Sequence, residues 1–279
     1  MRALTDIYPD LGTGIGLRRP YWSEVLERPE ALGFVEVITE NYLEVSEAKL
    51  RSLDAVRGRL PVLFHGVSMS VGSADPLDGA YLDRVRALVE RFEPPWVSDH
   101  LCWTGVQTEN SHELLPLPLT EESLDHVSRK VEDAQRRLGV PLLLENPSTY
   151  LSFEVSTLDE GTFLRKLVER TGCGLLVDVN NAFVNARNHG TSAEDFLDGL
   201  PAAAVAQVHL AGFSDCGTHY FDTHDAPIAP GVWRLYARLV ERVGPVSTLI
   251  ERDDDFPPFE ELLEEVRRAH RVRELRRVA

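Results

Sequence analysis

The chain has 279 residues, and 43% of them are hydrophobic, which is enough to bury one large core. Its 29 lysines and arginines are outnumbered by 45 aspartates and glutamates, so the formal net charge is -16. Such a charge repels polyphosphates, and nucleic acid is therefore not an expected partner. The apolar runs are far shorter than the roughly 20 residues that cross a bilayer, so we expect no membrane span. Residues 1–6 do not resemble a secretory signal, and we expect a cytoplasmic protein.

Eight short apolar runs alternate with eight stretches of helical periodicity. The apolar runs predict strands at residues 13–18, 34–39, 61–65, 96–100, 141–145, 174–178, 205–210 and 246–251. The other stretches predict helices near residues 21–29, 46–58, 79–92, 120–138, 159–171, 191–198, 231–242 and 258–270. Continuous apolar strands are typical of a parallel sheet that is buried on both faces. Because about 250 residues is typical of a TIM barrel, the pattern predicts one α/β domain, a (β/α)8 barrel over residues 1–279. A doubly wound open sheet is the alternative.

Six of the predicted strands end in an imidazole or a carboxylate. The C-terminal ends of barrel strands surround the mouth at which active sites of this fold are built. Asp222 and His224 lie two residues apart, so both side chains can reach the mouth from one side of an extended segment. The strand-end residues that we expect to meet them there are His65, Asp99-His100, Glu145, Asp178, His209 and Glu251.

A pocket with four carboxylates and four imidazoles favours bound metal ions. Clustered carboxylates that are partly removed from water need counter-charge, and metal cations supply it. Histidine and carboxylate donors without thiolate favour Fe, Mn or Zn over Ca or Mg, and they do not choose among those three metals. Cys102, Cys173 and Cys216 form no C-x-x-C pair, which argues against a thiolate zinc site. Eight donors are too many for one ion, so we predict two or three ions with bridging carboxylates.

Other polar residues near the predicted mouth have two open interpretations each. Glu36 and Glu40 lie around the end of the second strand, where they contact substrate or serve a loop or helix cap. Asn181 either turns its amide toward the metal pocket or stabilises a loop turn. Arg18 either binds a substrate carboxylate or forms a salt bridge. We expect His189 to be a loop residue beside a turn glycine.

Six linked motifs resemble those of a known family. They follow one another in the order His65-Gly66-Val67-Ser68-Met69-Ser70, Ser98-Asp99-His100-Leu101-Cys102-Trp103, Glu145-Asn146-Pro147-Ser148, Asp178-Val179-Asn180-Asn181, His209-Leu210-Ala211-Gly212 and Asp222-Thr223-His224-Asp225. They are similar to the multinuclear non-haem iron-dependent oxidative enzymes, long catalogued as domain-of-unknown-function family 692. That family includes the iron-binding subunit of methanobactin biosynthesis. The resemblance extends from Gly14 to Glu251.

The resemblance implies a fold, a reaction and partners. It implies a xylose-isomerase-like TIM barrel that holds two or three iron ions, with Mn or Zn as the other metals to consider. It also implies O2-dependent oxidation of a residue, often cysteine, in a ribosomally made peptide substrate. A small partner protein that recognises the leader of that peptide belongs to the same expectation.

The resemblance also implies which residues bind iron. At the position of Asn181 the methanobactin enzyme looks to have a histidine, so Asn181 is included as a candidate metal ligand. An amide binds iron weakly, so this departure predicts a weaker site for a third ion. We expect Glu145, Asp178 and His209 to be the catalytic residues. The implied iron ligands are His65, His100, Glu145, Asp178, His209, Asp222, His224 and Glu251.

Three other functions are compatible with the pattern of ligands. Zinc-dependent apurinic endonucleases have a similar set, but a nuclease needs a basic surface for phosphates, which a charge of -16 opposes. A divalent-metal sugar isomerase usually needs a catalytic lysine or a His-Asp base, and Lys49, Lys130 and Lys166 are not placed for that role. A metal-binding scaffold that acts only as a subunit is the non-enzymatic alternative.

Overall fold

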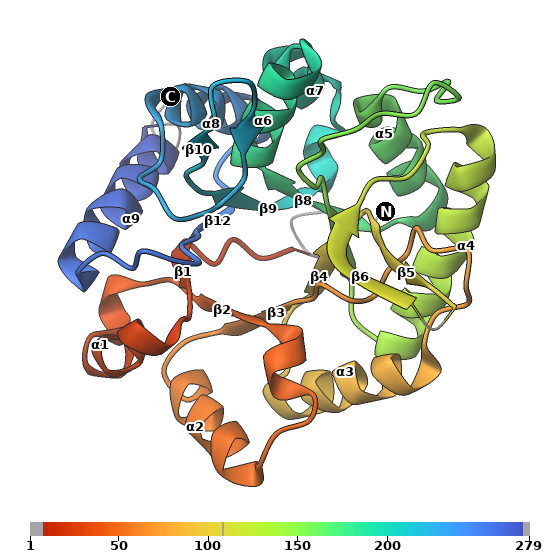
Figure 1. Ribbon diagram of the computed structural model, residues 1–279. Helices are drawn as coiled ribbons and strands as arrows, with labels where there is room; N and C mark the ends of the chain where they lie inside the picture. The colour runs from red at the N-terminus through yellow and green to blue at the C-terminus, as the bar shows by residue number, and fades with distance from the viewer. Residues whose placement is uncertain (1–7, 108, 276–279) are drawn as a thin grey trace.

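The computed structural model describes residues 8–107 and 109–275, and eight of its strands close into a parallel barrel (Figure 1). The first strand pairs with the last, with Thr13 opposite Thr248, so the sheet has no free edge. The expected (β/α)8 barrel is therefore confirmed and the open sheet is wrong. In spatial order the strands are β1 (Thr13–Gly16), β12 (Ser247–Ile250), β9 (Val205–Leu210), β8 (Gly174–Asp178), β7 (Leu142–Glu145), β4 (Val97–His100), β3 (Val62–His65) and β2 (Val35–Ile38).

Helices surround the barrel on its outer side, as Figure 1 shows along the barrel axis. Their inward stripes of leucine and valine pack against the outward side chains of the strands in one continuous core. No helix within the described residues is both long enough and apolar enough to cross a membrane. The helices are α1 (Trp22–Glu27), α2 (Glu47–Arg57), α3 (Gly79–Phe92), α4 (Glu121–Leu138), α5 (Glu160–Thr171), α6 (Val179–His189), α7 (Ala193–Gly199), α8 (Pro230–Val243) and α9 (Phe259–Glu274).

Helix α6 differs from the sequence-based expectation, which had a single helix near residues 191–198 after β8. The chain enters α6 directly from β8, because the Asp178 side chain caps the helix by accepting a hydrogen bond from the Asn181 backbone N–H at 2.7 Å. Asparagine is a poor helix former, and α6 contains Asn180, Asn181 and Asn185. Of the two interpretations of Asn181, the loop turn is therefore wrong, since this residue lies in the first helical turn.

The inner face of the barrel has an apolar floor with polar residues above it. A cluster of buried side chains that includes Leu63, Leu143, Leu176 and Leu249 fills the lower part. Side chains two residues apart point to the same face of a strand. The residue two positions after each of these leucines is therefore also on the inner face, nearer the mouth: His65, Glu145, Asp178 and Glu251.

Two hairpins interrupt the simple alternation of strands and helices, and the sequence pattern did not predict either. Strands β5 (Trp103–Val106) and β6 (Glu109–Leu115) follow β4 and extend over one side of the barrel in Figure 1. Strands β10 (Ser214–Asp215) and β11 (Tyr220–Phe221) follow β9. Both hairpins belong to connections after the C-terminal ends of barrel strands, so they build the rim of the mouth.

Candidate metal centre

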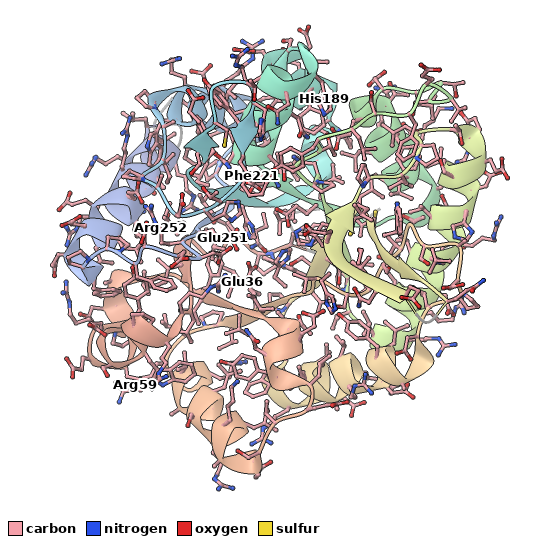
Figure 2. The ribbon with its side chains drawn as sticks, in the orientation of Figure 1. Glu36, Arg59, His189, Phe221, Glu251 and Arg252 are labelled. Carbon is pink, nitrogen blue, oxygen red and sulfur yellow. The ribbon has the colours of Figure 1, made fainter. Side chains whose placement is uncertain are left out.

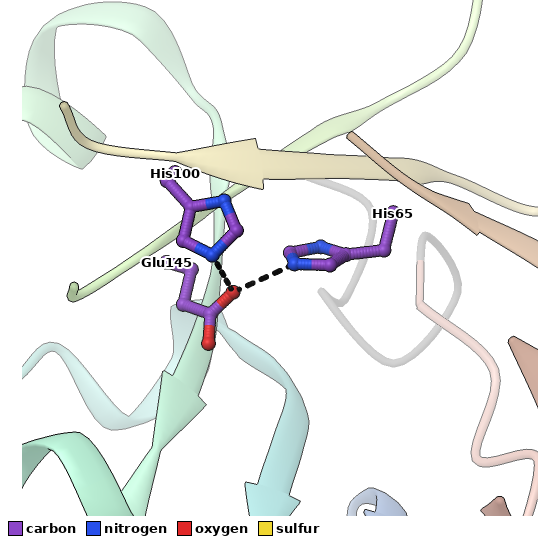
Figure 3. Close-up of side chains that lie close together, drawn as sticks. All are labelled: His65, His100 and Glu145. Carbon is purple, nitrogen blue, oxygen red and sulfur yellow. Dashed lines mark ion pairs between the residues drawn. The ribbon is translucent and has the colours of Figure 1, made fainter. Parts of the chain in front are cut away.

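Two histidines converge on one carboxylate oxygen at the ends of β3, β4 and β7 (Figure 3). The Nε2 atoms of His65 and His100 lie 3.1 Å and 3.2 Å from Oε2 of Glu145. The other ring nitrogen of each histidine is held from behind, by the Ser98 hydroxyl at 2.9 Å for His65 and by the Gly66 carbonyl at 3.1 Å for His100. Both rings are thus fixed with Nε2 toward Glu145.

Glu145 also belongs to a second group, with Asp178 and His209. One donor atom from each of the three lies within 4.8 Å of the others. Nδ1 of His209 is 3.6 Å from Oε1 of Glu145 and 3.1 Å from Oε2 of Glu251. His209 and Asp178 are fully buried, so this group lies in the interior of the mouth.

Asp178 continues into a third group, with His224 and Glu251. Nε2 of His224 lies 3.9 Å from Oδ2 of Asp178, and its Nδ1 lies 3.4 Å from Oε2 of Glu251. Asp222 approaches the same histidine, with Oδ1 2.8 Å from Nε2, and accepts a hydrogen bond of 2.6 Å from the Asn180 amide. The three groups share Glu145 and Asp178, so they form one continuous row of donors.

Several donor atoms in this row are buried and make no hydrogen bond of regular geometry, although some of them lie within 3.2 Å of another donor of the row. A buried polar atom that lacks a partner costs about 1–3 kcal/mol, unless something else satisfies it. A set of neutral imidazole nitrogens and carboxylate oxygens that share this lack fits divalent transition-metal ions. The atoms are Oε2 of Glu145, Oδ2 of Asp178, Oδ1 of Asn181, Nδ1 of His209 and Nε2 of His224.

The pKa values of residues in the row show that, without metal, its carboxylates need positive counter-charge. Burial lowers the pKa of His65, but the Glu145 carboxylate outweighs it and raises this pKa to about 9. His209 and His224 likewise have pKa values well above the ordinary range, because neighbouring carboxylates outweigh burial. Burial raises the pKa of Asp178 far above its usual range. Protons on these groups supply the positive charge that bound cations supply in a metal centre.

The structure shows what the weaker candidates contact. Glu36 points into the barrel (Figure 2), where its Oε1 lies 2.9 Å from Nε2 of His209. Arg18 forms salt bridges with Asp253 and with Glu251, at 3.3 Å for the latter. Glu40 accepts hydrogen bonds from the Val67 backbone and the Tyr81 hydroxyl, so it orders the loop after β3.

His189 is not a loop residue, because it is the last residue of α6, and its Nε2 lies 2.7 Å from Oγ1 of Thr149. Sequence reasoning missed Ser98, whose hydroxyl holds His65, and Gln207, whose amide nitrogen donates a hydrogen bond to Glu36. The signal for both was present: each is a polar residue inside an otherwise apolar strand, two positions before a candidate ligand.

The Gly212→Ala substitution should disturb the third group without touching a donor. A Cβ at Gly212 would lie 2.0 Å from the Ala226 carbonyl oxygen, and the Gly212 carbonyl accepts from the His224 backbone N–H. We expect the free energy of unfolding to fall by about 1–3 kcal/mol in chemical denaturation. Gly199→Ala is the control, since its Cβ would meet no atom nearer than 3.9 Å. Equal stability of the two variants would contradict this account.

The comparison with known proteins connects this geometry to a family. A family model described as RiPP precursor modification enzyme MbnB/TglH/ChrH matches residues 12–274. The chain belongs to this family. This match confirms the family resemblance seen in the sequence motifs. RiPPs are ribosomally synthesised and post-translationally modified peptides. By family, the chain is therefore a peptide-modifying enzyme.

Curated relatives match along most of their length. A UPF0276 protein of Rhizorhabdus wittichii is 51% identical over 255 residues, which cover 91% of each chain. A UPF0276 protein of Caulobacter vibrioides is 49% identical over 262 residues, which cover 93% of each chain. These names give no activity, so they support the family and not a particular substrate.

Solved structures with a similar fold come from several enzyme classes. A xylose isomerase-like TIM barrel protein from Mycobacterium smegmatis, in complex with magnesium, has a TM-score of 0.59 at 13% identity and covers 98% of each chain. Endonuclease IV from Thermus thermophilus has a TM-score of 0.55 at 18% identity, covering 93% of this chain and 97% of its own. At such low identity these similarities show the fold alone, and the expected xylose-isomerase-like barrel is confirmed.

Proposed function

We propose that this protein is a multinuclear iron enzyme that uses O2 to oxidise a residue, with cysteine as the first candidate, in a RiPP precursor peptide. The observation that carries the proposal is the continuous row of three donor groups, which share Glu145 and Asp178. Its second support is the family, whose members modify such peptides. A small partner protein that recognises the peptide leader is part of the proposal.

The proposed ligands follow the three groups. Because Glu145 and Asp178 each belong to two groups, we assign them as bridging carboxylates between neighbouring ions. Asn181 offers only a neutral amide oxygen, and its buried Oδ1 without a partner supports a weak contact with one ion. The proposed iron ligands are His65, His100, Glu145, Asp178, Asn181, His209, Asp222, His224 and Glu251.

Iron, when bound, supplies one-electron chemistry with O2, which no side chain of this chain can perform. The residues themselves hold the donors in place and keep bulk water away. Glu145, Asp178 and His209 are proposed as catalytic residues, because their central group is fully buried and adjoins both outer groups. Their burial would keep bulk water away from the metal that they would hold.

The rim beside the row offers surface for a peptide. Tyr150 and Phe221 are each 47% exposed and stack with ring centroids 5.3 Å apart. The Tyr150 hydroxyl accepts a hydrogen bond from the Asp222 backbone N–H at 3.0 Å, so this aromatic pair directly adjoins a proposed ligand. A cavity of about 640 Å³ is lined in part by Thr149 and Leu151, the residues on either side of Tyr150 in the chain, and by none of the proposed ligands. Exposed aromatic and apolar groups next to a reactive centre favour binding of an extended peptide.

The test is metal analysis followed by a peptide assay. Protein purified without oxygen should contain two or three irons per chain by elemental analysis, with magnetic coupling between them in Mössbauer spectra. A short candidate precursor peptide encoded next to the gene should then change mass when the iron-loaded protein, any adjacent small protein and O2 are added. Zinc without iron, together with cleavage of abasic DNA, would instead support the phosphodiesterase alternative.

Removal of metal should lower the thermal stability of the protein. A ligand at about 100 times its Kd stabilises the folded state by about 2.7 kcal/mol, and 1 kcal/mol shifts Tm by about 2–4 °C in a domain of this size. We therefore expect a strong chelator to reduce Tm by at least about 5 °C, with recovery on anaerobic addition of Fe(II). An unchanged Tm after measured loss of metal would contradict a metal centre built from the barrel strands.

A further inference from the structure

A line of buried hydrogen bonds runs across the barrel interior to His209. Nε1 of Trp96 donates to Oε1 of Gln207 at 2.8 Å, and Nε2 of Gln207 donates to Oε2 of Glu36 at 2.6 Å. An indole N–H only donates, so the atom it meets on Gln207 is the amide oxygen, and the amide orientation is fixed. Trp96 and Gln207 are fully buried and Glu36 is 3% exposed, so water does not compete for these bonds.

Glu36 faces Nε2 of His209. Its Oε1 lies 2.9 Å from this nitrogen, and a carboxylate oxygen can only accept, so Nε2 is placed to donate to Glu36 when it carries hydrogen. The Gln207 amide nitrogen has two hydrogens: one bonds Oε2 of Glu36, and the nitrogen is also 3.0 Å from Nε2 of His209, which accepts from it when Nε2 carries no hydrogen. A cation on Nδ1 would select between the two, because the remaining hydrogen of the imidazole is then on Nε2 and Glu36 is its acceptor. Nδ1 of His209 is left as the nitrogen that faces Glu145 and Glu251.

We propose that Glu36, held by Gln207 and Trp96, is a positioning residue that fixes His209 with Nδ1 toward the central donor group. This inference rests on the proposed function, in which His209 is a metal ligand. In His65 and His100, Nε2 faces the donor groups and Nδ1 contacts a hydroxyl or a carbonyl oxygen. In His209, Nδ1 faces the donor groups and Nε2 contacts a carboxylate. A carboxylate behind a metal-bound imidazole raises its basicity and fixes its orientation.

The test compares the same type of substitution, glutamate to glutamine, at two positions. Glu36→Gln removes the charge behind His209. Glu40→Gln removes a charge four residues along the chain, where the carboxylate contacts Val67 and Tyr81 and no histidine. Zn²⁺ is the probe, because it is diamagnetic and does not react with O2. Metal-free protein is titrated with Zn²⁺ against a competing chelator, and His209→Ala identifies the binding step that depends on this imidazole.

We expect Glu36→Gln to weaken the His209-dependent step by about 10- to 100-fold and to leave the other steps within about twofold. Glu40→Gln should leave the His209-dependent step unchanged. In two-bond ¹H–¹⁵N spectra of the Zn²⁺-loaded, histidine-labelled protein, His209 should show hydrogen on Nε2 in the wild type and in Glu40→Gln, and an altered signal in Glu36→Gln. Gln207→Met keeps the Glu36 carboxylate but removes the hydrogen bond that holds it, so it should weaken the same step less. This variant is the substitute if Glu36→Gln does not fold.

Three results would overturn the inference. Unchanged Zn²⁺ affinity in Glu36→Gln, equal weakening of every step, or hydrogen on Nδ1 of His209 in the wild type each contradicts a positioning role for Glu36. These results differ from failure of the proposed function. If His209→Ala changes no binding step at all, His209 is not a ligand, and the proposed metal centre itself is wrong.

Discussion

Glu145→Gln should remove two metal positions at once and abolish peptide modification. The carboxylate is shared by two donor groups, and its Oε2 lies within 3.2 Å of two imidazoles. An amide offers one weak oxygen and no charge, so it cannot bridge two cations. Because loss of a residue that merely supports a ligand costs about 10- to 100-fold, we expect a loss of at least about 100-fold in kcat/KM here.

Metal content and histidine titration provide the measurements for this variant. Elemental analysis should show at most one iron per chain, because the variant keeps only the position that Glu145 does not serve. In the metal-free protein the pKa of His65, which burial lowers and the Glu145 charge raises to about 9, should fall when that charge is removed. Glu132→Gln on the exposed side of α4 is the matched control and should change neither quantity. Full iron content in Glu145→Gln would contradict the bridging assignment.

Asp178→Asn should stabilise the metal-free protein while it abolishes metal-dependent activity. Asp178 is fully buried, its Oδ2 has no hydrogen-bond partner, and burial and the charges of Glu145 and Asp222 outweigh the nearby imidazoles in raising its pKa. In the metal-free protein Asp178 must either bury a charge or hold a proton that a free carboxyl would have lost, and both cost stability. Asparagine removes that cost and still caps α6, since its side-chain oxygen can accept from the Asn181 backbone. We expect a gain of about 1–3 kcal/mol in the free energy of unfolding without metal.

Chemical denaturation with and without metal tests both halves of this expectation. With iron present the wild type should be more stable than Asp178→Asn, because it gains binding energy that the variant lacks. Asp159→Asn is the matched control: Asp159 also caps a helix, α5, but it lies at the surface and its pKa is already lowered, so no gain is expected. A metal-free Asp178→Asn variant that is less stable than the wild type would show that the carboxylate serves the fold itself.

The candidate ligands at the strand ends were predictable because each stands where an apolar run stops. Leu63 and His65, or Leu143 and Glu145, share one strand face, and the same alternation that buries the leucine brings the polar residue to the mouth. Parallel strands of a closed barrel then place all such ends on one rim. Nothing beyond strand periodicity and barrel closure was needed to predict that these residues meet.

The supporting residues were not predictable in the same way. Glu36 and Gln207 are 171 positions apart in sequence, and their hydrogen bond exists only across the closed barrel interior. The sequence therefore left Glu36 with two interpretations, and neither was support for His209. Helix α6 was missed for a local reason: its start depends on one side-chain cap, and its asparagines hide the helical period.

Because β12 pairs with β1 and closes the barrel, the proposed metal centre can be completed only late in chain synthesis. Glu251 directly follows β12, and β12 is held between β1 and β9. A nascent chain that ends before β12 has the His65 group but has neither a closed barrel nor the last carboxylate. The complete row of donors therefore exists only once the final strand is in place, so we expect metal to fill every position of the proposed centre only after the barrel has closed.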